Sequence, residues 1–195
     1  MHRKHLVGIA PLLAVICLAA APAAAQAEPH WYLNSVLLKP GKKYNFKTEG
    51  KLTFSIPGTT IVVGCTVKDA DSLLNPIGGG AGTDLMTAFK LSECGPNPCP
   101  VNSAGVPAAF KATTLKLPWA SKLVEVPPIA DEMSGIEVVF SCKGFGVFAK
   151  GSGTLSPWVN PGGYLEFTAG TGTLGGMSVT GIDVFRPAVV SAKNP

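Results

Sequence analysis

The most regular pattern of apolar and polar positions in the chain lies between residues 51 and 71. Every second residue is apolar in two short runs, Leu52, Phe54 and Ile56, and then Ile61, Val63, Cys65 and Val67. Pro57-Gly58 separates the runs, and this pair is typical of a tight turn because proline fixes one backbone dihedral while glycine frees the next. A period of two on both sides of a turn predicts a β-hairpin with one buried face.

A second alternating segment precedes another cysteine. Ile136, Val138, Phe140 and Cys142 fall on one face of a predicted strand, as Cys65 does in the hairpin. Both thiols are therefore expected to point into the core of a β domain.

The remaining apolar runs are short and are separated by glycine and proline. Residues 28–195 hold no sustained i, i+3, i+4, i+7 pattern, which argues against amphipathic helices. About ten short strands with turns between them predict a single all-β, antiparallel domain over 28–195, built as a β-sandwich or barrel. Residues 72–83 are expected to form a loop, and 85–94 a strand with Leu85, Thr87, Phe89 and Leu91 on one side.

The first 27 residues have the layout of a secretory signal peptide. Basic residues 2–5 precede an apolar, helix-forming run that ends in small residues, so cleavage is expected after Ala25 or Ala27. An uncleaved anchor is the alternative, because residues 6–25 are just long enough to cross a bilayer. Cys17 is interpreted as an apolar filler, since Ile16 stands where a lipoprotein signal needs a small residue.

Cleavage changes the charge balance. The full chain carries +4, and loss of Arg3 and Lys4 with no acid lowers this to +2. A nearly neutral chain has no electrostatic footprint for nucleic acid or anionic lipid. The mature protein is therefore predicted to be secreted, extracellular and free of the membrane, with an unknown oligomeric state.

Four cysteines remain after cleavage, and an even number in an exported chain predicts disulfides. Cys94 and Cys99 flank a short proline-stiffened loop, which favours a local bridge and leaves Cys65 to pair with Cys142. A four-cysteine zinc site is the less favoured alternative, because the chain has no C-x-x-C pair.

Several short motifs, taken in order, resemble a group of secreted actinobacterial β-rich proteins. They include the W-Y-x-N start at residues 31–34, Asn75-Pro followed by glycines, the L-P-W segment at 117–119, and the strand that ends at Cys142. The resemblance covers most of residues 28–195. It implies location and fold but no activity, because no chemistry is established for the group.

Candidate catalytic residues are few. His30 is the only histidine after cleavage and lies near a chain end, and no nucleophile motif accompanies it. Glu125, Glu137 and Glu166 are the candidate carboxylates of a glycan hydrolase, although each is expected to face water from its strand. Three aspartates, Asp69, Asp71 and Asp84, flank the loop at 75–82 and could supply oxygens to calcium, but solvated turn residues are the favoured interpretation. The sequence predicts no cofactor.

Aromatic side chains are the best binding candidates, because flat rings with polar edges suit sugar and peptide surfaces. Trp31, Tyr32 and Trp158 are the possible ligand-binding residues, whereas Trp119 is expected to plug the core. The sequence thus favours a non-enzymatic binding or structural module whose partner is a cell-surface glycan or protein. A secreted glycan hydrolase is the alternative.

Overall fold

A computed structural model describes residues 28–195, all in strands, turns and loops. The predicted signal peptide, with its expected helix and cleavage site, lies outside these residues. The fourteen strands are β1 (His30–Leu33), β2 (Val36–Leu37), β3 (Tyr44–Ser55), β4 (Val62–Leu74), β5 (Thr83–Gly95), β6 (Phe110–Leu115), β7 (Trp119–Val124), β8 (Ala130–Cys142), β9 (Gly146–Leu155), β10 (Trp158–Asn160), β11 (Tyr164–Phe167), β12 (Thr173–Leu174), β13 (Met177–Arg186) and β14 (Val190–Lys193). The all-β prediction is confirmed.

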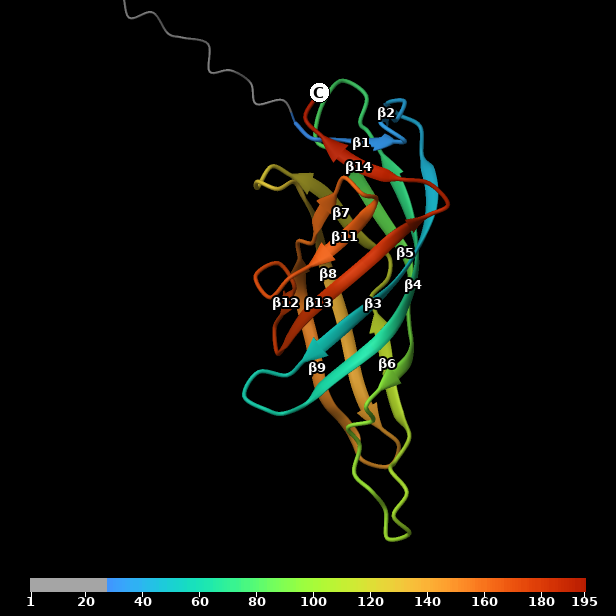
Figure 1. The fold of residues 1–195 in the computed structure, drawn as a ribbon, viewed down its shortest axis with the longest axis vertical. Coiled ribbons are helices and arrows are strands. Elements are labelled where there is room, and N and C mark those ends of the chain that lie inside the picture. The colour runs from blue at the N-terminus through green and yellow to red at the C-terminus, as the bar shows by residue number, and fades with distance from the viewer. Residues whose placement is uncertain (1–27) are drawn as a thin grey trace, which may run out of the picture.

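Eight antiparallel strands close into a barrel, which decides between the two predicted architectures. Their order is β10-β11-β13-β3-β4-β5-β7-β8, and pairing of Trp158 with Ala130 joins β10 back to β8. The lower half of the long strand β8 also pairs with β6 on one side and β9 on the other. Strands β14, β1 and β2 form a small sheet across the upper end (Figure 1).

The predicted hairpin is confirmed as β3 and β4. Phe54 pairs with Val63 and Leu52 with Cys65, and all four side chains are buried. The turn between them contains Gly58, whose φ of 77° lies in the left-handed region that glycine adopts without strain. Alternation continues beyond the predicted strand, because β4 runs on to Leu74.

The disulfides pair differently from the prediction, which is wrong on this point. Cys65 is bonded to Cys94 and Cys99 to Cys142, with Cα–Cα distances of 4.1 and 5.7 Å. Cys94 lies on β5, the direct neighbour of β4, whereas β5 and β7 separate β4 from the strand that carries Cys142. Two disulfides suggest an oxidising extracellular environment.

Trp31 closes the upper end of the barrel. Its side chain is fully buried, its Nε1–H donates to the Thr83 carbonyl over 3.1 Å, and its ring packs edge-on against Phe185. Asn75 fixes the backbone beside it, accepting from Trp31 N–H at 2.8 Å and donating to the carbonyls of Trp31 and Leu38. The W-Y-x-N start and Asn75 therefore form one structural unit.

Trp119 plugs the middle of the barrel as predicted. Only 2% of it is exposed, its ring lies 5.2 Å from that of Phe89, and its Nε1–H donates to the Leu115 carbonyl over 2.9 Å.

Residues 28–195 include no helix that could cross a membrane.

Candidate functional site

Five aspartates lie inside the barrel and form an acidic belt around its upper half. They come from four strands: Asp69 and Asp71 from β4, Asp84 from β5, Asp131 from β8 and Asp183 from β13, and each is at most 5% exposed. Each strand alternates, and these positions share the inward phase with neighbouring apolar residues. Asp69, Asp71 and Asp84 are therefore not solvated turn residues, and that expectation is wrong.

Two hydroxyl groups are built into the acidic belt. Thr48 Oγ1 donates to Asp183 Oδ2 over 2.8 Å and also contacts Asp69 Oδ1, while Ser121 Oγ donates to Asp131 Oδ1 over 2.6 Å. Within residues 28–195, neither carboxyl oxygen of Asp71 has a hydrogen-bond partner, and one oxygen each of Asp69, Asp131 and Asp183 also lacks one.

No basic side chain compensates these carboxyl groups, because no lysine, arginine or histidine of residues 28–195 is buried. Burial is the main cause that raises their pKa values, to about 6 for Asp84 and about 8 for Asp131. The pKa of Asp69 and of Asp71 is also raised, first by burial and then by neighbouring aspartates. An unpaired buried carboxylate is costly, so burial favours the protonated form of these carboxyl groups.

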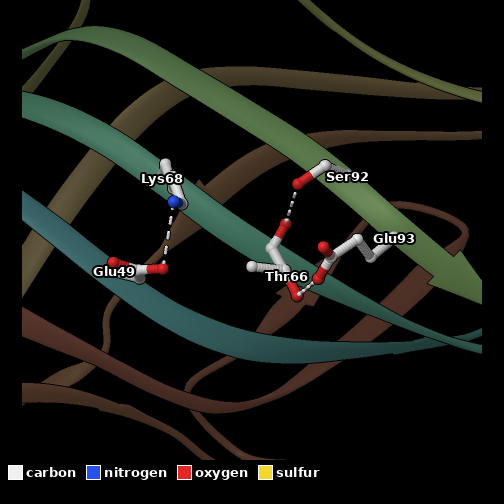
Figure 2. Close-up of polar contacts among 5 residues, drawn as sticks. All are labelled: Glu49, Thr66, Lys68, Ser92 and Glu93. Atoms are coloured by element: carbon white, nitrogen blue, oxygen red, sulfur yellow. Dashed lines mark hydrogen bonds and ion pairs between the residues drawn. The ribbon is translucent and has the colours of Figure 1, made fainter.

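The same strands show the opposite arrangement on their outer face. Lys68, next to Asp69 in the chain, points outward and lies 3.1 Å from Glu49 of β3, and Thr66 donates to Glu93 of β5 over 2.9 Å (Figure 2). These acids on the outer face are thus paired with donors, whereas several carboxyl oxygens inside the barrel have no hydrogen-bond partner.

Each aspartate of the acidic belt is at most 5% exposed, although Asp71 lines, with Phe46 and Arg186, a surface depression of about 450 Å³. The buried apolar core of the barrel includes Trp31, Phe46 and Phe185, where Phe185 packs edge-on against the other two rings, and also Leu52, Phe89 and Trp119. Among residues 28–195, no three carboxylate, histidine or cysteine side chains are arranged to hold a metal ion. The belt is accordingly part of the core.

The open candidate site is a groove beside Trp158, with a volume of about 320 Å³. Trp158 points outward because its neighbour on β10, Val159, is 4% exposed and fills the barrel. It lies where β10 meets β8 and closes the barrel, and it pairs with Ala130 of β8 on one side and Glu166 of β11 on the other. The groove is lined by Val124, Val126, Ala130, Glu132, Thr154, Ser156, Trp158, Gly170, Thr171 and Thr173.

Hydroxyl groups supply most of the polar atoms in the Trp158 groove. Thr171 is held by its own loop, where its Oγ1 accepts from Thr168 N–H at 3.0 Å, and Thr173 donates to the Ala169 carbonyl over 3.2 Å. In the described part of the chain, the hydroxyls of Thr154 and Ser156 form no hydrogen bond. They are free to bond a ligand while it lies against the indole ring.

Two further depressions continue the groove along the outer face of β7 and β8. One shares Glu132 and is also lined by Lys122 and Ser134, and the next shares Val124 and reaches Glu125. The whole surface is therefore elongated, and an extended ligand can contact it at several points.

The other predicted binding aromatics lie elsewhere. Trp31 is 0% exposed and cannot meet a ligand at the surface. Tyr32 lies on the small upper sheet, where Lys193 Nζ is 5.6 Å from its ring centroid, and it does not line the Trp158 groove. His30 pairs with Lys193 in the same sheet and is also outside the groove.

The three candidate carboxylates do not meet. Glu137 is buried and paired with Lys116 at 2.8 Å and Lys150 at 2.9 Å, so the expectation that it faces water is wrong. Hydrogen bonds from these lysines lower its pKa. Glu166 faces outward and pairs with Trp158, which pairs in turn with Ala130 of β8. Ala130 lies seven residues before Glu137 on the same strand, a separation of roughly 20 Å at the rise of a strand. Glu125 accepts from Asn194 at 2.6 Å.

Comparisons with protein-family models, with curated proteins and with solved structures find no match to this chain. The geometry of the groove and of the belt is therefore the basis for the functional argument. Residues 28–195 form a disulfide-bonded β-barrel domain with an aromatic groove on its outer face.

Proposed function

We propose that this chain is a non-enzymatic binding module that holds a hydroxyl-rich polymer, such as a cell-surface glycan, in the Trp158 groove. The observation that carries the proposal is the outward indole of Trp158 next to the unbonded hydroxyls of Thr154 and Ser156. A sugar presents apolar C–H faces and hydroxyl edges, and such a site matches both.

The chemistry of the groove supports binding over hydrolysis. Its lining contains one carboxylate, Glu132, and no histidine or cysteine. Glycoside hydrolysis needs two carboxyl groups about 5–10 Å apart on either side of the bond. The carboxyl groups with raised pKa values belong to the acidic belt, outside the groove, and are at most 5% exposed.

The test is retention of the purified protein on insoluble chitin, cellulose and bacterial peptidoglycan. Trp158→Ala is expected to weaken retention about thirtyfold, since loss of a central aromatic contact costs on the order of 2 kcal/mol. Phe145→Ala, which removes an exposed aromatic outside the groove, is the matched control and should bind as wild type does. Failure of the wild type to bind any of these polymers contradicts the proposal.

Export is part of the proposal. Residues 1–27 direct secretion and are removed after Ala25 or Ala27, and the two disulfides are consistent with that destination. Intact-mass measurement of protein from the culture medium should give a chain that begins at Gln26 or Glu28. Recovery of only full-length chain, in membranes, contradicts it.

A further inference from the structure

The lower end of the molecule carries exposed apolar side chains on two neighbouring segments. We call residues 96–109 and 143–148 together the tip; they hang below the barrel in Figure 1, the first after β5 and the second from the end of β8 into the start of β9. Their exposed fractions are high for apolar residues: Val101 64%, Val106 56%, Phe145 61%, Val147 62% and Phe148 38%.

The two segments of the tip are held together as one surface. The Cys99–Cys142 disulfide links them, and Lys143 N–H donates to the Ala109 carbonyl over 2.9 Å. Phe148 packs near Phe110 and Phe140, with ring centroids 6.2 and 6.3 Å away. The apolar side chains are thus presented on a fixed scaffold, and a partner that covers them does not have to order a flexible loop.

The charges around the tip have one sign. Residues 96–109 contain no charged side chain, and residues 94–124 and 138–165 contain no aspartate or glutamate. Lys116 and Lys150 are paired with Glu137, whereas Lys111 and Lys143 form no ion pair within the described residues. The nearest other acid in the chain, Glu93, accepts the Thr66 hydroxyl on the outer face of β4 and β5.

We propose that the tip docks on an anionic lipid surface, with Phe145, Val147 and the two exposed valines of the 96–109 loop in the interface and Lys111 and Lys143 at the headgroups. An apolar surface with a basic rim is the pattern that binds anionic bilayers peripherally. The net charge of +2 for residues 28–195 does not show this pattern, because it does not record that the residues around the tip contain lysines and few acids.

The experiment is co-sedimentation of the purified chain with vesicles of phosphatidylcholine alone or of equal parts phosphatidylcholine and phosphatidylglycerol. Wild type should bind the anionic vesicles at least tenfold more tightly than the neutral ones. Raising the salt from about 0.05 to about 0.5 M should weaken this binding, since salt screens the lysines.

Matched variants locate the binding surface. Phe145→Ser with Val147→Ser, and separately Lys111→Glu with Lys143→Glu, should each reduce binding to anionic vesicles at least tenfold. The controls are Val36→Ser with Ile77→Ser and Lys39→Glu with Lys43→Glu, which change exposed residues at the upper end. All variants carry the same N-terminal segment, so a difference between tip and control pairs arises from the tip.

Three outcomes of the vesicle experiment overturn the proposal. They are equal binding to neutral and anionic vesicles, equal loss in tip and control variants, and absence of binding to both vesicles. If the tip instead joins two copies of this chain, wild type sediments as a dimer without vesicles and the serine pair as a monomer, which also overturns it. Thermal unfolding of each variant near the wild-type temperature shows that the fold is intact.

Discussion

The acidic belt and the Trp158 groove are both polar clusters, but they differ in access and in partners. The belt gathers five buried carboxyl groups inside the barrel, with pKa values raised chiefly by burial. The groove has one carboxylate, free hydroxyls and an indole ring open to water. Strongly shifted pKa values often mark active sites. Here they mark a core, and the groove is the accessible surface.

This comparison assigns separate roles to the two regions. The belt should determine the stability of the barrel and how it depends on pH, and the groove should determine binding. The predictions below change one region at a time.

The largest expected effect follows from Thr48→Val. The valine has nearly the same shape but removes the hydroxyl that donates to Asp183 and contacts Asp69, so a buried acceptor loses its donor. We expect the free energy of unfolding to fall by about 3 kcal/mol. Urea unfolding measures it.

Thr53→Val is the matched control, because Thr53 lies on the outer side of the same strand. It should change the unfolding free energy by less than about 0.5 kcal/mol. Equal effects of the two substitutions would show that the belt hydroxyl has no special role.

The next effect is an unusual pH dependence. The folded-state pKa values of Asp84 (about 6) and Asp131 (about 8) lie above those of the unfolded chain, so the folded state binds more protons. Their contribution to stability is complete below about pH 4 and is lost as pH rises through 6 and 8. We expect the unfolding free energy to fall by on the order of 2 kcal/mol between pH 5 and pH 6.

Asp131→Asn should flatten this dependence, since the amide keeps an acceptor for Ser121 but cannot ionise. Glu49→Gln, on the outer face beside Lys68, is the control and should leave the slope unchanged. Stability that rises from pH 5 to pH 8 in wild type would mean that the belt carboxyls are ionised in the folded protein.

Alternation of apolar and polar residues predicts much of the barrel, but it did not predict that the aspartates of the belt are buried. Val63, Cys65 and Val67 predicted the buried face of β4. The same phase continued by two and four residues reaches Asp69 and Asp71, but their charge and their position beside a loop favoured solvated turn residues. Only the tertiary structure shows that this strand stays inside a closed barrel.

Three other features of the fold cannot be predicted from the local sequence pattern. The register of β5 shifts between the pairs Ala70–Ala88 and Asp71–Met86, which places Asp84 and Met86 inward instead of Leu85 and Thr87. Disulfide pairing likewise depends on strand order, which alternation does not specify. Trp158 was predicted as a candidate, but its groove requires β7, β8, β9 and the loop before β12 to come together.

Glu132→Gln should have the smallest effect in the groove. The amide keeps the shape and removes a charge from a half-buried position, so a binding module should retain its polymer within about twofold. Turnover of a glycan by wild type that Glu132→Gln abolishes would instead support the hydrolase alternative. A hydrolase screen on the same chitin, cellulose and peptidoglycan measures it.

The most direct measurement is retention on these polymers and urea unfolding of Trp158→Ala and Thr48→Val side by side. Trp158→Ala should lose about thirtyfold in retention while its unfolding free energy changes by about 1 kcal/mol or less, because the side chain is only half-buried. Thr48→Val should lose stability while its folded fraction binds as wild type does. Undiminished retention of Trp158→Ala, with binding lost in Thr48→Val at full folding, would contradict the assignment of binding to the groove.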